Sequence, residues 1–204
     1  MLNRLFDNWV YGGFLAGLLL LALSPLITSH WPAALTATFF CLPAYMIHQY
    51  EEHDKDRFRA FVNHTLGNGH EVLTRGAVFL INVVGVWGGI ASAIWLTARV
   101  NPGFALIAVY LLVLNAVIHV VSAVVARSYN PGLVSGILLF LPLGCWGWIA
   151  VEDSGAGTPA MHAIGLAAAV AMHLAIVIPV LRNRHRYDER HISSTRGSSG
   201  AARG

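Results

Sequence analysis

The chain has 204 residues, of which 56% are hydrophobic and only 11% are charged. Soluble domains carry about 25% charged residues, so this composition excludes an ordinary soluble protein and indicates an integral membrane protein folded as one compact bundle. The net charge of +3 is less informative than its distribution along the chain. The two cysteines, Cys41 and Cys145, lie inside apolar runs, which excludes a disulfide scaffold or a zinc knuckle.

Six apolar runs follow one another along the chain, and each is long enough to cross a bilayer as a helix, which needs about 20 residues. The runs cover residues 9–27, 31–50, 76–98, 102–126, 131–151 and 159–181. We therefore predict an all-α fold, a polytopic bundle of six transmembrane helices. Residues 1–182 are expected to form this single domain, and residues 183–204 a flexible, basic, low-complexity tail.

The basic residues predict the orientation of this bundle. Six spans place both termini on one side of the membrane, and each of the 13 lysine and arginine residues except Arg99 then falls on that side. Cytoplasmic loops are enriched in lysine and arginine. The pattern predicts that both termini are cytoplasmic, together with the 51–75 loop, in a multi-pass protein of the bacterial cytoplasmic (inner) membrane.

Four polar residues inside the predicted spans lie at about the same depth below the cytoplasmic end of their helices. His48, Asn82, His119 and His173 belong to four different runs, and each lies seven to nine residues from the basic residue that ends its helix. At 1.5 Å per residue these depths are roughly 10–14 Å. Ionisable groups within membrane spans are functional candidates, and unrelated polar residues have no reason to align. The alignment therefore predicts a shared site near the cytoplasmic face.

The stretch MIHQYEEH ends the second predicted span. His48, Glu51 and Glu52 are spaced i, i+3 and i+4, so they share one face of a helix. Two adjacent carboxylates near hydrocarbon repel one another and are costly to desolvate. A divalent cation would neutralise both and give the neighbouring histidine a role.

Histidine and carboxylate without cysteine suit zinc, iron or manganese, and we favour zinc, with one or two irons as the alternative. The predicted ligands are His48, Glu51, Glu52, His119 and His173. A catalytic zinc ion needs three protein ligands and an open position, so one of the two glutamates would remain as a catalytic general base acting on water. Alternatively, both glutamates bridge two irons.

Further polar residues are predicted to support this site or to position a substrate. They are Asn82, Asn115, His53 and His64. Asn82 and Asn115 fit equally well as hydrogen-bonding residues that hold helices together. Histidines on the far side or in the tail are left out of the site: His30, His162, His185 and His191.

Three motifs occur in order: HXXEE at 48–52, a further histidine at His119, and Tyr-Asn-Pro-Gly at 129–132. Together they resemble the HXXEE family of bacterial membrane proteins over most of the predicted bundle, roughly residues 5–180. That family is defined by sequence and has no settled activity, so the resemblance implies a role for the motif residues but no substrate.

The resemblance also singles out the 129–132 turn, in which Tyr129 and Asn130 are expected to support the site or to position a substrate. Physically, Pro131 starts the next helix and Gly132 lets the backbone approach another element closely. A looser similarity exists to intramembrane proteases of the CAAX-processing type, which pair two adjacent glutamates with histidine and asparagine on other helices.

The function expected from these features is a membrane metalloenzyme acting on a lipid-soluble or amphipathic substrate, with hydrolysis by metal-activated water favoured. A non-haem di-iron hydroxylase or desaturase is the first alternative, and a non-enzymatic transporter or metal-handling protein is the second. The expected partners are membrane lipids and a hydrophobic small-molecule or lipid substrate, with no nucleic acid.

Overall fold

The computed structural model describes the backbone of residues 2–201 and the side chains of residues 3–187 and 189. Within this range the chain is helical, with short connections and no β-strand. The elements are α1 (Leu2–Thr28), α2 (Ala33–His53), η1 (Asp54–Asp56), α3 (Arg57–Thr65), α4 (Arg75–Phe79), η2 (Leu80–Trp87), α5 (Gly88–Arg99), η3 (Pro102–Phe104), α6 (Ala105–Ala126), α7 (Leu133–Ser135), η4 (Gly136–Phe140), α8 (Leu141–Asp153) and α9 (Pro159–Ala201).

Helices of membrane-spanning character make up most of this fold. Among the described residues, five helical segments are long and apolar enough to cross a membrane: Asn3–Ile27, Arg75–Arg99, Pro102–Ala126, Leu133–Asp153 and Pro159–Tyr187. The predicted all-α, multi-pass membrane architecture is confirmed at this level.

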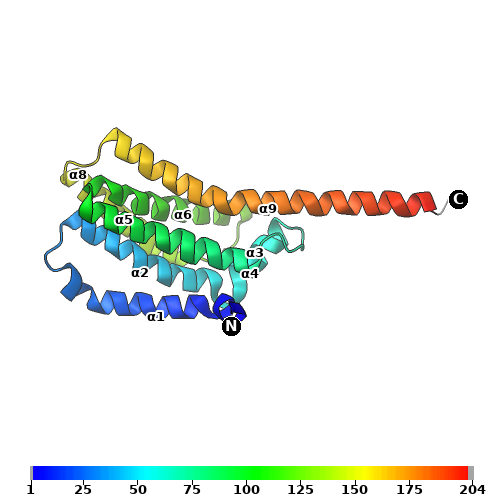
Figure 1. Cartoon of the computed structure of the whole chain (residues 1–204), viewed down its shortest axis with the longest axis horizontal. Coiled ribbons are helices and arrows are strands. Elements are labelled where there is room, and N and C mark those ends of the chain that lie inside the picture. Colours follow the sequence, from blue (N-terminus) through cyan, green and yellow to red (C-terminus); the bar gives the residue numbers. More distant parts are fainter. Residues whose placement is uncertain (1, 202–204) are drawn as a thin grey trace.

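Helix α2 is the sixth long helix of the bundle, but it is not one of those five apolar segments. With 21 residues it is about 32 Å long, which is enough to span a hydrocarbon core. Its final turns, however, carry Gln49, Glu51 and Glu52, and much of its surface is buried by other helices instead of facing lipid. Helix α2 packs against α1, α5, α6 and α8, and it lies between α1 and α5 in Figure 1.

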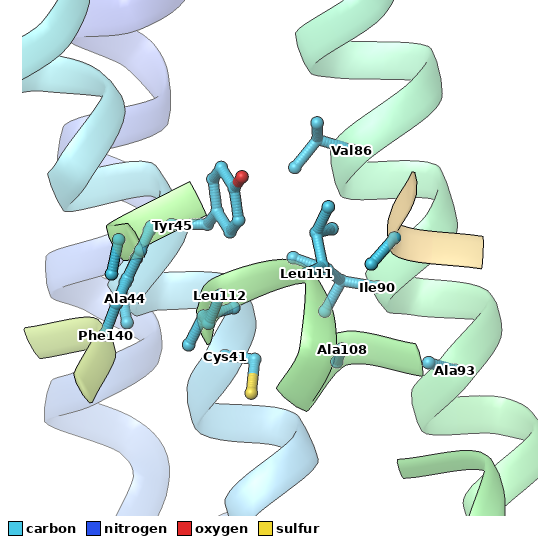
Figure 2. Packing of buried hydrophobic residues seen from close by; sticks show 12 residues of the cluster. Cys41, Ala44, Tyr45, Val86, Ile90, Ala93, Ala108, Leu111, Leu112 and Phe140 are labelled. Atoms are coloured by element: carbon cyan, nitrogen blue, oxygen red, sulfur yellow. The ribbon is translucent and has the colours of Figure 1, made fainter. Parts of the chain in front are cut away.

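The main core gathers around the middle of α2. Figure 2 shows Cys41 and Tyr45 of α2 facing Leu111 and Leu112 of α6, and Ile90 of α5 lies beside them. These side chains are at most 4% exposed. Tight packing against α5, α6 and η4 in this core fixes the rotation of α2 about its axis. This rotation determines where the polar residues of its last two turns point.

Two of the long helical segments contain a wider, π-helical stretch. One is η2, which continues α4 into α5, and the other is η4, which joins α7 to α8. Such stretches are rare and frequently occur at functional sites. Both lie beside the last turns of α2: buried Asn82 belongs to η2, and Phe140, which packs on His48, belongs to η4.

Helix α9 continues as one helix through most of the segment predicted to be a flexible tail. Figure 1 shows it leaving the bundle at the end where α3, α4 and the N-terminus lie. Just beyond residue 182, Asn183 donates a 2.9 Å hydrogen bond to the Val72 carbonyl, and Tyr187 stacks on His70. The first residues of the predicted tail therefore contact the 66–74 connection. Residues 202–204 lie outside the described range, and the flexibility of the tail stays a prediction.

Candidate metal centre

Three side chains with metal-binding atoms meet where the end of α2 faces α6. His48 and Glu52 lie one turn apart on α2, and His119 comes from α6. Nε2 of His48 is 3.7 Å from Oε2 of Glu52, and Nε2 of His119 is 3.6 Å from Oε1 of Glu52. The three residues are 0%, 6% and 6% exposed, respectively, and they form the candidate metal group found among the described residues. We call them the His–Glu cluster.

The separations within the His–Glu cluster match ligands around one ion. Zinc bonds of about 2.0–2.2 Å in tetrahedral geometry place neighbouring ligand atoms roughly 3.4 Å apart. A charge-assisted N–H···O hydrogen bond is shorter, about 2.7–2.9 Å. The observed nitrogen–oxygen distances of 3.6 and 3.7 Å are too long for such hydrogen bonds. Each is within a few tenths of an ångström of the separation expected between two ligand atoms on one zinc ion.

The ring of His48 is held through its other nitrogen. Nδ1 lies 2.9 Å from the hydroxyl of Ser135, and that hydroxyl donates a short hydrogen bond to Oε2 of Glu51. Because the hydroxyl proton points at the carboxylate, the oxygen accepts from His48, and Nδ1 carries the imidazole proton. Nε2 of the neutral ring is then a lone pair facing Glu52, and it has no hydrogen-bond partner among the described residues.

His119 is oriented in the same way by Asn130. The Asn130 amide nitrogen donates a 2.8 Å hydrogen bond to the backbone carbonyl of His119, so its oxygen faces the ring and accepts from Nδ1 at 2.6 Å. Nε2 of His119 therefore also presents a lone pair to Glu52. Metal-binding histidines almost always donate their second ring N–H to a neighbouring acceptor in this manner.

Two imidazole lone pairs and one carboxylate thus converge in a buried site with no donated proton among them. Such an arrangement is repulsive and poorly solvated unless a cation lies between the three groups. The residues fit a divalent metal: a neutral histidine pair and one carboxylate match the donor set of several catalytic zinc and mononuclear iron sites.

Glu51 is not part of the cluster, although it is adjacent to Glu52. Its carboxylate accepts hydrogen bonds from the Tyr129 hydroxyl at 2.8 Å, the Val134 N–H at 3.0 Å and the Ser135 N–H at 2.7 Å. Val134 and Ser135 begin the helical segment Leu133–Asp153, whose first N–H groups have no partner within their own helix. Glu51 therefore caps a neighbouring helix, where a negative charge also complements the helix dipole.

The 129–132 turn closes over the cluster. Partial burial and the bond to Glu51 raise the pKa of Tyr129, which keeps its hydroxyl protonated as a donor. Gly132 has φ +98°, and a Cβ built on it would lie 2.6 Å from His119 and 2.8 Å from His48. The close approach predicted at Gly132 is therefore to the imidazole rings of His119 and His48, which leave no room for a side chain at this position.

Aromatic rings line the apolar side of His48. The ring of Phe140 lies 4.3 Å and that of Tyr45 lies 5.7 Å from the imidazole, measured between centroids. Phe140 is fully buried and Tyr45 is 2% exposed. They keep water from that side of the cluster, which strengthens electrostatic interactions inside it.

Asn82 belongs to a separate polar network with Gln49 and Trp87, and it also borders a small cavity that Glu52 lines. It accepts a 2.8 Å hydrogen bond from the amide of Gln49 and donates to the carbonyl of Val78, while Trp87 donates to the Gln49 oxygen. Asn82 therefore joins η2 to α2 and is not part of the cluster. The sequence interpretation missed Gln49 and Ser135. Gln49 lies within the HXXEE stretch, so its position inside an apolar helix was a usable signal.

The remaining predicted residues divide into two groups. His53, Asn115 and His173 border the small cavity that Glu52 also lines, and Nδ1 of His173 lies 2.8 Å from the Ala169 carbonyl. This carbonyl can only accept, so Nδ1 is the donor. His64 is exposed on α3, away from the cluster.

A family model described as "Protein of unknown function with HXXEE motif" matches residues 39–147, slightly more than half of the chain. The chain therefore belongs to this family. The match covers α2 through most of α8, a shorter range than the resemblance predicted. No curated protein and no solved structure matches the chain.

Proposed function

We propose that this member of the HXXEE family is a membrane-embedded metalloenzyme in which His48, Glu52 and His119 hold one divalent cation, with zinc favoured. The observation that carries the proposal is the His–Glu cluster itself: two anchored imidazole nitrogens face one buried carboxylate at 3.6–3.7 Å. Two histidines and one glutamate are also the protein ligands of well-known catalytic zinc sites.

The favoured reaction is hydrolysis of a lipid-soluble or amphipathic substrate. A bound zinc ion supplies Lewis acidity, which polarises a carbonyl or phosphoryl oxygen and activates water. Because the Glu51 carboxylate caps a helix, we assign the general-base role expected for one glutamate to Glu52, with one of its oxygens holding the metal and the other accepting the proton. A carboxylate that binds a metal through one oxygen keeps the second for accepting a proton.

A mononuclear iron hydroxylase is the second candidate. Two histidines and one carboxylate around open positions are also typical of non-haem iron oxygenases. The two-iron alternative is less well supported, because a bridging pair of glutamates needs Glu51, which is occupied by Tyr129, Val134 and Ser135.

An apolar groove beside the cluster supports a lipid substrate. It has a volume of about 520 Å³ and is lined by residues that include Ala44 and Ile47 of α2 and Leu139 of η4. Ile47 directly precedes His48, and Leu139 precedes Phe140, whose ring packs on His48. An acyl or isoprenoid chain in this groove would contact Ile47 and Leu139, the residues that precede His48 and Phe140, and the groove's volume is within the usual range for ligand sites.

We further propose that the protein has six membrane spans, the five apolar segments and α2, and that both termini lie in the cytoplasm of a bacterial cell. This topology is supported by the distribution of lysine and arginine, because it leaves a single basic residue, Arg99, on the non-cytoplasmic side. The His–Glu cluster then lies near the cytoplasmic face of the inner membrane.

Oxygen isotopes test this function in a mixture of lipids, so the substrate need not be identified first. Zinc-loaded protein is reconstituted with a bacterial polar lipid extract in H₂¹⁸O, and products are analysed by mass spectrometry, with Glu52→Ala as the inactive control. Hydrolysis predicts lipid products that carry ¹⁸O from water. Iron-loaded protein is supplied with a chemical reductant as well, because hydroxylation reduces the second atom of O₂ to water; products that take ¹⁸O from ¹⁸O₂ would then favour the hydroxylase. Absence of labelled product from either source would contradict an enzymatic role.

A further inference from the structure

His53 separates two cavities of different character. On one side is an outer pocket of about 300 Å³, bordered by the start of α1, the turn after α2 and the start of α4. On the other side is an inner cavity of about 30 Å³ that Glu52 also borders. His53 is the residue that lines both, and it is itself only 6% exposed.

The outer pocket has the lining of a water-filled space. Four of its lining residues are charged: Asp7, Lys55, Asp56 and Arg75. Its positive and negative charges are balanced and partly paired, since Arg75 lies 2.9 Å from Asp7. These features favour water over a strongly charged ligand.

The inner cavity has room and polar partners for water. A water molecule needs about 10–15 Å³ of accessible volume, so 30 Å³ is sufficient for at least one. Two polar atoms of its lining residues, Nε2 of His53 and Oδ1 of Asn115, are buried without a hydrogen-bond partner in the described part of the chain. Buried polar groups are rarely left unpaired, so Oδ1 of Asn115 requires a polar occupant, whereas Nε2 of His53 already lies 3.1 Å from Oε2 of Glu52.

The His53 ring lies between one lining residue of each space, Trp9 of the outer pocket and Phe58 of the inner cavity. Each of these two rings lies 5.2 Å from that of His53, and the contacts are apolar. Its Nε2 lies 3.1 Å from Oε2 of Glu52 but does not meet hydrogen-bond geometry. A single side chain therefore separates the outer pocket from the cavity beside Glu52.

We propose that the inner cavity is a binding site for water, that this water enters from the outer pocket, and that His53 is the gate between them. A hydrolase whose site lies in hydrocarbon needs such a supply, because lipid delivers none. The inference rests on the proposed function only for the use of the water. The path itself exists whether or not a metal is bound.

Hydroxyl-radical labelling by pulsed X-rays tests the gate, because radicals form from water in place and oxidise nearby methionine to the sulfoxide. Met172 borders the inner cavity, whereas Met46 is buried on α2 and borders neither space. Metal-free protein in detergent is used, so the outcome does not depend on the proposed chemistry. Met172 is partly exposed and Met46 is buried, so their wild-type rates serve as baselines, and the change that each His53 variant causes is the test.

The variants isolate the role of His53. His53→Ala should raise the rate of Met172 oxidation severalfold and leave Met46 unchanged, because the partition is shortened. His53→Phe keeps a ring in place but removes the polar atom, and it should lower the Met172 rate below that of the wild type. His64→Ala, on the exposed face of α3, is the matched control and should have no effect.

Unchanged Met172 oxidation in both His53 variants would overturn the proposal. Failure of the isotope experiment with a positive labelling result would instead reject the hydrolase and keep the water site.

Discussion

Glu51 and Glu52 are neighbours on α2 but bind different partners. The carboxylate of Glu51 accepts N–H groups at the start of another helix, whereas that of Glu52 faces the Nε2 atoms of His48 and His119. One glutamate therefore positions the scaffold, and the other belongs to the cluster. This division has consequences for stability and for metal binding that can be measured separately.

Alanine variants of the two glutamates should behave in opposite ways. In metal-free protein, Glu51→Ala should lower stability by about 1–3 kcal/mol for each N–H group left without a partner. Glu52→Ala should not, because it removes a buried carboxylate whose nearest polar atom, Nε2 of His53 at 3.1 Å, is not in hydrogen-bond geometry. Addition of zinc should then raise the melting temperature of Glu51→Ala but not that of Glu52→Ala.

Thermal unfolding in detergent measures both effects. Asp7→Ala, which removes an exposed ion pair with Arg75, serves as the control and should change stability by less than about 1 kcal/mol. Equal responses of the two glutamate variants to zinc would argue against separate roles.

Ser135→Ala should weaken metal binding without removing a ligand. The Ser135 hydroxyl holds Nδ1 of His48, and loss of such an outer partner typically lowers metal affinity about 10–100-fold. Competition with a fluorescent zinc chelator measures this change. Ser92→Ala, whose hydroxyl bonds to its own helix at the Gly88 carbonyl, should bind zinc like the wild type. Wild-type affinity in Ser135→Ala would mean that His48 is not a ligand.

Gly132→Ala should be more harmful than Gly155→Ala. Both glycines have positive φ, +98° and +72°, so alanine costs about 1–2 kcal/mol of backbone strain at either position. Only at Gly132 would the new Cβ also collide with His119 and His48, since nothing lies within 4 Å at Gly155. Because backbone strain is common to both variants, the difference between them in melting temperature and in zinc binding measures the effect of the steric clash with the two histidines. Equal effects would contradict the contact between the turn and the imidazoles.

Reporter fusions test the six-span topology. Fusions after Arg99 and after Asp153 should report the non-cytoplasmic side, and fusions near Arg57 and Arg184 should report the cytoplasm. If α2 does not cross the membrane, the sites on its two flanks will lie on the same side, and fusions at Ser29 and Arg57 will then report one compartment.

Much of the fold could be predicted because it depends on local composition. Apolar runs bounded by basic residues predicted the long helices, and the shared depth of His48 and His119 predicted that they meet. The apolar count also predicted α2 as a span but did not show that other helices cover much of it, which is why its final turns can carry polar residues. The shared depth also included Asn82 and His173, which border a small cavity beside Glu52 but are not part of the His–Glu cluster.

The division between the two glutamates could not be predicted from spacing alone. Glu51 and Glu52 are both within about 60° of His48 around the helix, so helical geometry allows either to join the cluster. What separates them is a tertiary contact, the uncapped start of the helix at Leu133. Pro131 and Gly132 offer no capping side chain for this helix, which was the available signal that its cap comes from elsewhere.

Metal content of the purified protein decides whether the His–Glu cluster is a metal centre. Protein produced with zinc and iron in the medium is purified without chelator and analysed by elemental mass spectrometry, alongside His48→Ala, Glu52→Ala, His119→Ala and His173→Ala. We expect about one metal ion per chain in the wild type and in His173→Ala, and almost none in the three cluster variants. Full occupancy in the three cluster variants, or no metal in a folded wild-type protein, would show that these residues do not hold a metal.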